Sequence, residues 1–198
     1  DSVVIYDVNA DQAKKVASIH NADIAHTYEE LFHRVDAVSL CVPTPFHYDV
    51  AMKVINAGIH MLIEKPICLS SGEGKKLAEQ ITEDLVIGVG HIERFNPIVA
   101  EIAQMISNPL YIEFKRHNPT SSRVTGSSVV EDLMIHDIDI ILSLVKSKVK
   151  EVRASGIAVV SENVDIANAR IEFENGAVAN VTASRISQKK MRKMRMFQ

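Results

Sequence analysis

The 198 residues suffice for one large domain or two small ones, and a content of 46% hydrophobic and 24% charged residues is ordinary for a folded globular protein. No apolar run approaches the length of a membrane span, and a net charge of −3 gives no overall basic field for nucleic acid. Two cysteines, Cys41 and Cys68, provide neither a disulfide framework nor a clustered metal site, and no signal peptide opens the chain, so a reducing, cytoplasmic location is expected.

The first half of the chain alternates short apolar runs with helical patterns. Two capping boxes, Thr27 to Glu30 and Ser70 to Glu73, mark helix starts, and Gly58 is expected in the left-handed conformation that ends a helix. Strands are predicted at residues 3–6, 37–42, 60–63 and 85–89, and helices at 11–19, after Thr27, at 48–57 and at 70–81. Short, fully apolar strands that alternate with helices predict a parallel sheet with helices on both faces.

The pattern changes near Gly90, and the second half is rich in strands. The Asn175-Gly176 pair is a strong signal for a hairpin turn between two alternating runs. Helices are predicted at 97–106 and 129–145, a polar stretch at 118–128, and strands at 110–116, 149–160, 167–173 and 177–183. The alternation predicts an open, mainly antiparallel sheet with one face exposed to water. The basic residues at 188–195 are interpreted as a solvated edge, and a phosphate-binding role stays open as the alternative.

We therefore expect two domains, residues 1–92 of α/β type and residues 93–198 of α+β type. The sequence opens directly in a strand and stops without a terminating signal, so both domains are expected to be parts of a longer protein. A glycine-rich phosphate loop is not found in the first domain, because Gly88 and Gly90 lie within and after a strand rather than in a strand-to-helix turn.

Asp7 ends the first predicted strand. In a dinucleotide-binding fold, a carboxylate at the corresponding strand end accepts hydrogen bonds from the adenosine ribose and disfavours a ribose phosphate, so Asp7 favours NAD over NADP. An aspartate that caps the next helix explains the same residue equally well.

After the strand at 37–42, two prolines fix the chain, and Thr44 and His47 direct polar groups to the carboxyl edge of the sheet. A plain turn in which His47 caps the following helix is the alternative.

The run Ile63-Glu64-Lys65-Pro66-Ile67 places a carboxylate, an ammonium and a proline after a buried strand. Ligands collect at the carboxyl ends of the strands in open α/β sheets, and a lysine in that position is able to exchange protons with a bound alcohol. A surface Glu-Lys pair before a turn proline is the competing interpretation.

The apolar helix at 129–145 carries Asp132 and His136 on one face, four residues apart, with Asp139 three further on. Burial of these groups without partners is costly, so they either pair or line a cavity, and an aspartate beside a histidine suits proton transfer. A structural Asp-His pair remains open. A metal site at these three residues is less favoured, because no further ligands are evident.

At the expected domain junction, the segment 90–97 contains Arg94 and Asn96, which could hold a polar or anionic group of a substrate. In the alternative, Asn96-Pro97 merely starts a helix and Arg94 pairs with Glu93 or solvent.

Taken together, Pro43-Thr44-x-x-His47, Glu64-Lys65-Pro66 and Asp132-x-x-x-His136-x-x-Asp139 resemble the Gfo/Idh/MocA family of NAD(P)-dependent sugar oxidoreductases. The resemblance implies a Rossmann-type domain followed by an α+β domain with an open sheet. It implies Lys65 as the catalytic lysine, His136 as a second proton-transfer residue with Asp132 as its partner in the substrate pocket, and Asp7 at the adenosine ribose. The residues implied to line the nicotinamide side of the cofactor site are Pro43, Thr44, His47 and Glu64, with Lys65 and Pro66 beside them.

The segments 90–97 and 132–139 are similar to one branch of the family, which oxidises the 3-hydroxyl of UDP-N-acetylglucosamine or related UDP-sugars. The resemblance thus implies hydride transfer from a sugar secondary alcohol to NAD, with a small sugar or UDP-sugar as substrate and no nucleic acid, membrane or metal. Two alternatives stay open: an NAD-retaining glycoside hydrolase of the same fold, and a non-catalytic nucleotide-binding regulator. An exposed face of the second sheet would favour a homodimer or homotetramer.

Overall fold

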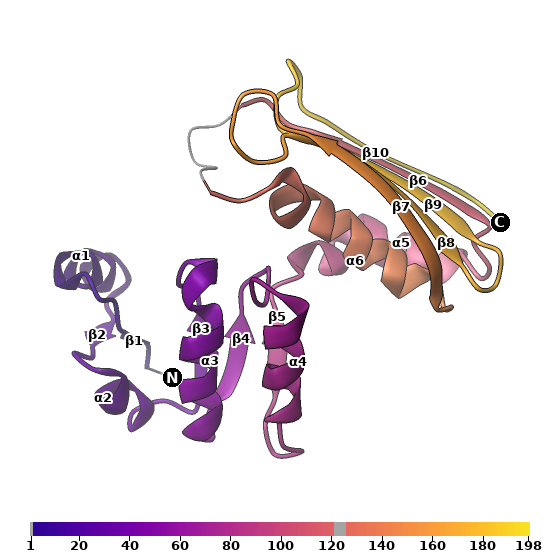
Figure 1. Cartoon of the computed structure of the whole chain (residues 1–198). Helices are drawn as coiled ribbons and strands as arrows, with labels where there is room; N and C mark the ends of the chain where they lie inside the picture. Colours follow the sequence, from indigo (N-terminus) through magenta and orange to yellow (C-terminus); the bar gives the residue numbers. More distant parts are fainter. Residues whose placement is uncertain (1, 121–125) are drawn as a thin grey trace. The chain divides into compact units, whose positions relative to one another are not determined.

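The computed structural model describes residues 2–120 and 126–198. The chain divides into two compact units, Asp1–Gly90 (unit 1) and His91–Gln198 (unit 2). Figure 1 shows unit 1 in indigo to magenta and unit 2 from magenta to yellow. The division falls within two residues of the boundary predicted at residue 92. Part of the predicted polar stretch at 118–128, namely 121–125, lies outside the described residues.

Unit 1 is built from short parallel strands and helices in alternation. Its elements are β1 (Val4–Ile5), α1 (Ala10–His20), β2 (Asp23–Ile24), α2 (Tyr28–Phe32), β3 (Ala37–Leu40), η1 (Thr44–Phe46), α3 (His47–Asn56), β4 (His60–Ile63), α4 (Ser71–Glu79) and β5 (Ile87–Val89). The predicted parallel α/β arrangement is confirmed, since both β1–β2 and β3–β4–β5 pair in parallel.

Among the described residues, these strands form two sheets rather than the single predicted one. Strand β2 went unpredicted because it has only two residues, too few to show a period. A groove of about 680 Å³ lies between the two sheets, and its walls are the strand residues of β1 and β3 with their flanks. The carboxyl end of β1 and that of β3 also border a second cavity, described with the candidate site below.

Local capping signals in the sequence account for most helix boundaries in unit 1. The predicted box at Ser70 and Glu73 is present, with the Ser70 hydroxyl accepting from the Glu73 N–H at 3.2 Å. Gly58 has a φ of +71°, as expected for the residue that follows a helix end. Thr27 caps α2, but the prediction of a complete box there is wrong, because the Glu30 carboxylate accepts from the N–H of His26 instead of Thr27.

The core of unit 1 lies between α3, α4 and the sheet β3–β4–β5. Its buried members are Leu40, Ala51, Val54, Ile55, Ile59, Met61, Ile63, Cys68 and Leu77. Each apolar side chain buried there contributes roughly 1.5–3 kcal/mol relative to an exposed one. This packing fixes the carboxyl ends of β3 and β4, where the candidate residues of this unit lie.

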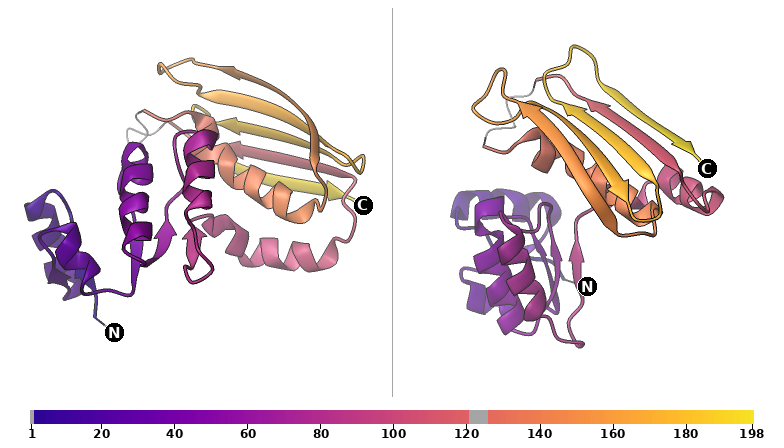
Figure 2. Two further views of the ribbon diagram at one scale, coloured as in Figure 1. Left: turned by 60° about the horizontal axis from the view of Figure 1, so that its bottom comes forward. Right: turned by 45° about the vertical axis from the view of Figure 1, so that its right-hand side comes forward.

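Unit 2 is an open sheet with helices on one face. Its elements are η2 (Ile92–Phe95), α5 (Pro97–Met105), β6 (Tyr111–His117), η3 (Val130–Met134), α6 (Ile135–Leu144), β7 (Val149–Ile157), β8 (Ile166–Phe173), β9 (Val178–Ser184) and β10 (Met191–Phe197). The strand order is β10-β6-β9-β8-β7, in which only the β6–β9 pair is parallel, so the predicted mainly antiparallel sheet is confirmed. Both views of Figure 2 show α5 and α6 along one face of this sheet.

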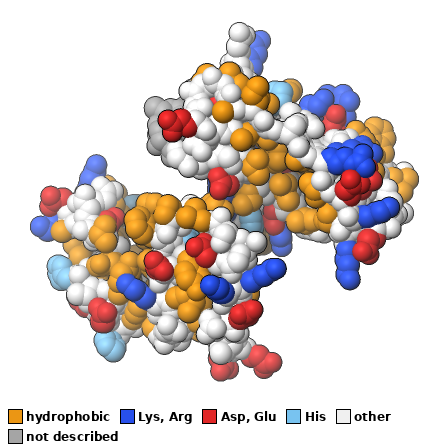
Figure 3. Space-filling model, in the orientation of Figure 1, with side chains coloured by type: hydrophobic (Ala, Val, Ile, Leu, Met, Phe, Trp, Pro, Cys, Tyr) orange, Lys and Arg blue, Asp and Glu red, His pale blue; other side chains and the backbone are white. Residues whose placement is uncertain are grey.

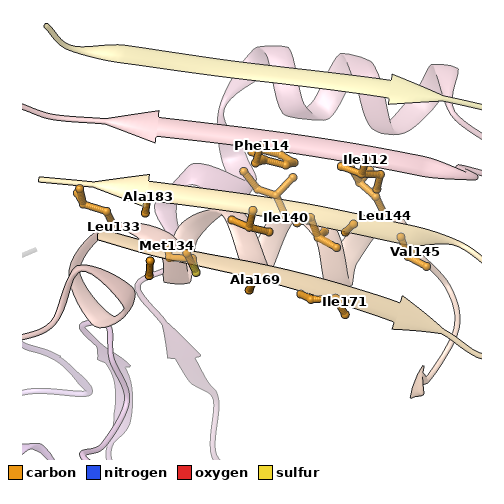
Figure 4. Packing of buried hydrophobic residues seen from close by; sticks show 14 of the residues in the cluster. Ile112, Phe114, Leu133, Met134, Ile140, Leu144, Val145, Ala169, Ile171 and Ala183 are labelled. Carbon is orange, nitrogen blue, oxygen red and sulfur yellow. The ribbon is translucent and has the colours of Figure 1, made fainter. Parts of the chain in front are cut away.

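The alternation predicted for residues 167–173 is present in β8, whose Ala167, Ala169, Ile171 and Phe173 are buried. They pack with Ile112 and Phe114 of β6 and with the apolar side chains of η3 and α6, as Figure 4 shows in part. The basic strand β10 lies at the edge of the sheet and is mostly exposed, as predicted.

The helix predicted at 129–145 differs from a regular α-helix. Its first part, η3, is a π-turn in which the N–H of Ile135 bonds to the carbonyl of Val130. One side of α6 is also open, with Leu142 48% exposed, although the segment is apolar almost all round. An extra residue in a helical turn shifts the faces on which later side chains lie, and such turns are frequent at functional sites. The four-residue spacing of Asp132 and His136 therefore spans a π-to-α junction.

No helix in the described parts of the chain is long and apolar enough to cross a bilayer. On the faces shown in Figure 3, acidic and basic side chains are interspersed over each unit.

A buried carboxylate, Asp165, organises the loop between β7 and β8. One of its oxygens accepts from the N–H groups of Val159, Val160 and Ser161 at 2.8, 2.8 and 3.1 Å, and the other accepts from Arg185 Nε at 2.8 Å. The backbone hydrogen bonds, followed by those from Arg185 and the Ser161 hydroxyl, lower the pKa of Asp165 far below its usual range and outweigh desolvation.

Because the folded-state pKa of Asp165 is depressed, its stabilisation is present above the unfolded-state pKa of about 3.9 and is lost as pH falls toward the folded value. Asp165→Asn is expected to lower stability at neutral pH and to flatten the decline of the free energy of unfolding between about pH 5 and pH 2. Urea denaturation across that range measures both effects. Glu162→Gln, an exposed carboxylate of the same loop, is the control and should retain the steeper acid decline.

Candidate functional site

The carboxyl ends of β3, β4 and β5 lie side by side. Leu40 pairs in register with Ile63, and Ile63 with Val89. The residues that follow these strands are therefore neighbours at one sheet edge, and Lys65 comes two residues after the middle strand. Lys65 is half-buried. This is the edge at which open parallel sheets bind ligands.

Glu64 packs against the backbone of Gly90 at this edge. A Cβ at Gly90 would lie 2.8 Å from Glu64 Oε2, a distance that side-chain carbons do not adopt. The two strands are held together there by the Gly90 N–H, which donates to the Ile63 carbonyl at 2.7 Å. A side chain at position 90 would therefore displace the Glu64 carboxylate, a close approach that the sequence did not reveal. Desolvation and the Glu64 carboxylate raise the pKa of the neighbouring Cys41 thiol.

His47 is the first residue of α3, and its side chain is 1% exposed. Its Nε2 lies 2.8 Å from the Val42 carbonyl oxygen and its Nδ1 lies 2.9 Å from that of Pro66. The alternative in which His47 caps the next helix is wrong, because the ring contacts these carbonyls and no side-chain cap bond is made. The predicted contact with a cofactor is not supported by this placement, since both ring nitrogens face the protein backbone.

Asp7 is exposed just beyond β1 and accepts a hydrogen bond from the Asn9 N–H at 2.8 Å. The helix cap of α1 is Asn9, so the interpretation of Asp7 as the capping residue is wrong. Asp7 lies on the wall of a cavity of about 260 Å³ that Cys41, Val42 and Pro43 also line. The β1 and β3 ends thus enclose a space with a carboxylate on one side, which suits a nucleoside with ribose hydroxyls. Thr44 begins η1 directly after Pro43.

In unit 2, Asp132 belongs to η3 and His136 to α6, and both side chains are half-buried. Asp132 lines a polar cavity of about 200 Å³ together with Thr120, Ser161 and Arg185. Asp139 does not join them, because the Arg94 guanidinium holds it in an ion pair, with Nε 3.0 Å from Oδ2. The Asp132-His136-Asp139 metal alternative therefore loses the second of its two carboxylates.

The polar residues of the segment 91–97 are engaged within unit 2. Arg94 pairs with Asp139 rather than with Glu93, although 49% of its side chain remains exposed to solvent. The hydrogen bond from Arg94 to Asp139, together with the carboxylate charge, raises the pKa of Arg94. Asn96 caps α5 by accepting from the Ile98 N–H at 3.1 Å, as the alternative interpretation predicted. The substrate-binding roles of Arg94 and Asn96 stay predictions, and each side chain already has a structural partner.

The sequence reasoning missed a buried ion pair between Arg116 of β6 and Asp137 of α6. Arg116 Nε lies 3.1 and 3.0 Å from the two Asp137 oxygens, and the Asp137 side chain is fully buried. Burial lowers the pKa of Arg116, but hydrogen bonding to Asp137 and its charge more than offset that effect. Arg116 also faces Glu93 at 3.5 Å, and Glu93 in turn binds Arg192 at 2.7 Å. Asp137 is adjacent to His136, so this network fixes the part of α6 that carries the predicted proton-transfer residue.

Comparison with known proteins gives consistent matches over both units. The model of the oxidoreductase family with an NAD-binding Rossmann fold matches residues 1–91, and that of the GFO/IDH/MocA C-terminal domain matches residues 104–197. UDP-N-acetylglucosamine 3-dehydrogenase of Acidithiobacillus ferrooxidans is 38% identical over 195 residues, which cover 98% of this chain and 62% of that protein. The scyllo-inositol 2-dehydrogenase (NAD(+)) of Bacillus subtilis is 32% identical over 77% of this chain and 49% of its own length.

Solved structures agree with these matches. The structure of the Acidithiobacillus ferrooxidans enzyme, GnnA, aligns with a TM-score of 0.93 over 100% of this chain and 63% of that one. GenD2 from gentamicin A biosynthesis, solved in complex with NAD, has the same fold at 20% identity, with a TM-score of 0.88 over 100% of this chain and 62% of its own. The chain thus spans less than two thirds of the relatives that it matches. With both of its units matched by models of one family, the chain belongs to the Gfo/Idh/MocA family of oxidoreductases.

Proposed function

We propose that the protein oxidises a secondary alcohol of a sugar, with the C3 hydroxyl of a UDP-amino sugar as the reacting group and NAD as the hydride acceptor. The observation that carries the proposal is the position of Lys65. It follows the middle strand of a parallel sheet in a chain that is 38% identical to a UDP-N-acetylglucosamine 3-dehydrogenase. The family's NAD-binding fold in residues 1–91 supports the cofactor class.

The residues of unit 1 fit a nicotinamide dinucleotide. Asp7 presents a carboxylate to the cavity between the β1 and β3 ends, where it would accept hydrogen bonds from ribose hydroxyls. The same negative charge would repel a ribose phosphate, which supports NAD over NADP. Pro43, Thr44, Glu64, Lys65 and Pro66 follow β3 and β4 and would hold the nicotinamide end. Bound NAD would supply the acceptor for the carbinol hydrogen.

In the proposed mechanism, Lys65 and His136 manage the hydroxyl proton. The neutral amine of Lys65 would receive the proton from the alcohol as the carbinol hydrogen leaves, and His136, four residues after Asp132, provides the second proton-transfer group. Asp132 lines a polar cavity with Thr120, Ser161 and Arg185, whose hydroxyls and guanidinium suit a hydroxyl-rich ligand. The proposal requires that Lys65 and His136 reach the same sugar.

A substrate panel tests this proposal. Full-length protein is incubated with NAD and, in parallel, UDP-N-acetylglucosamine, UDP-N-acetylgalactosamine, UDP-glucose, free sugars and inositols, and NADH is followed by absorbance. The expected result is NADH formation with UDP-amino sugars and a slower rate with NADP in place of NAD. Release of an aglycone from glycosides without net NADH would instead identify the glycoside hydrolase alternative. Turnover only with inositols would refute the sugar-nucleotide assignment.

A further inference from the structure

His47 connects two loops that the candidate site requires. One ring nitrogen faces the carbonyl of Val42, two residues after β3, and the other faces that of Pro66, three residues after β4. These carbonyls belong to different loops at the same sheet edge. A single side chain thus contacts both the turn that contains Pro43 and Thr44 and the Pro66-Ile67 peptide, one residue beyond Lys65.

The burial of the ring makes this connection energetically significant. His47 is 1% exposed, and a polar group left without a hydrogen-bond partner at such a position destabilises the fold. A protonated imidazole donates from both nitrogens, and a neutral one donates from only one. Because both partners are carbonyl oxygens, which only accept, the ring bonds to both loops only when both of its nitrogens carry a hydrogen. With both nitrogens facing these carbonyls, the ring has no nitrogen left for a ligand.

We propose that His47 is a positioning residue that clamps the Pro66-Ile67 peptide to the loop after β3 and so sets the place of the Lys65 side chain, one residue earlier. The inference rests on the proposed function, and it replaces direct cofactor contact by His47 with an indirect role. Fixing the carbonyl of Pro66 fixes the main chain immediately after Lys65. Since a displacement of about 1 Å can lower a rate about 10²-fold, the clamp is expected to act mainly on turnover.

Three substitutions separate the clamp from simple packing. His47→Leu keeps much of the volume and removes both nitrogens. His47→Asn places an amide donor near the position of Nδ1, which faces Pro66, and His47→Gln places one near Nε2, which faces Val42. In full-length protein, His47→Leu is expected to lower kcat by about 10- to 100-fold with less than a threefold change in KM for NAD. His47→Asn should recover more of the lost turnover than His47→Gln, because it retains the link to Pro66.

Ile55→Ala is the matched control, since it removes a buried side chain from the same helix without breaking a polar link. Its kcat should stay within about threefold of the parent at a temperature where both are folded. An equal loss of kcat in Ile55→Ala and His47→Leu would show that destabilisation alone explains the effect. Unchanged turnover in His47→Leu would likewise overturn the positioning role.

Amide hydrogen exchange provides a readout that does not depend on activity. His47→Leu is expected to increase exchange in residues 42–46 and 64–68 together, while Ile55→Ala should not produce that paired change. If the full-length parent oxidises no sugar, the proposed function fails and the exchange result still decides whether the clamp exists. Unchanged exchange at both loops in His47→Leu would refute the clamp even in an active enzyme.

Discussion

Replacing Lys65 by alanine is expected to lower kcat by roughly 10²- to 10⁴-fold, the range that a positioned proton-transfer group contributes. The residue follows the middle strand of the parallel sheet, where a bound alcohol and the nicotinamide are proposed to meet. NAD affinity should change by less than about threefold, because the proposed role of the Lys65 amine is to accept a proton rather than to anchor the dinucleotide. Stopped-flow NADH formation and calorimetric titration with NAD measure the two quantities.

Two companion variants sharpen that experiment. Lys65→Arg keeps the positive charge but cannot accept a proton near neutral pH, so it should be nearly as slow as Lys65→Ala if proton transfer is the role. Recovery of most turnover by Lys65→Arg would instead indicate that only the charge matters. Lys75→Ala, at an exposed position of α4, is the control for loss of a lysine in the same unit and should retain parental activity.

The features that could be predicted from the sequence are those that depend on only a few neighbouring residues. The strand that ends at Ile63 and the lysine two residues later follow from one apolar run and the residues after it. The capping box at Ser70 and Glu73 and the left-handed Gly58 are likewise local patterns. Such signals survive without tertiary information because their hydrogen bonds close within one turn of the chain.

The contacts that could not be predicted join residues far apart in the sequence. His47 reaches Pro66 across 19 positions, Arg116 reaches Asp137 across 21, and Arg94 reaches Asp139 across 45. Nothing in the local pattern around 132–139 indicated that Asp137 would be the fully buried carboxylate of that segment. The π-turn at η3 was not predicted either. The placement of Asp132 and His136 on one face assumed the regular α-helical period, and the π-turn changes that period.

Two ion pairs hold the part of α6 that carries His136. Asp137 and Asp139 are held by Arg116 and Arg94, so these arginines fix the turn of α6 that directly follows His136. The ion pairs set the rotation of α6 about its axis, and thereby the direction of the His136 side chain. The charged residues of segment 91–97 thus support the site by holding its helix, whether or not they also meet a substrate.

The largest stability effect is expected from breaking the Arg116–Asp137 pair. Asp137→Leu leaves the Arg116 guanidinium buried without its principal counter-charge, and removal of one partner of a buried pair typically costs about 3–5 kcal/mol. Arg116→Met leaves the fully buried Asp137 carboxylate in the same position and should be comparably destabilised. Denaturant unfolding of the full-length protein, monitored by far-ultraviolet circular dichroism, measures the free energy of unfolding of each variant.

The double variant Arg116→Met with Asp137→Leu distinguishes a charge effect from a packing effect. If the cost of each single change is an unpaired buried charge, the double variant should be less destabilised than the sum of the two, with a coupling of at least about 1 kcal/mol. Strict additivity would contradict this account. Glu151→Gln is the control, because its pair with Arg153 is exposed and exposed pairs contribute only about 0–1 kcal/mol. A double variant that regains stability but not turnover would further show that the pair is retained to orient α6 and His136 rather than to hold the fold together.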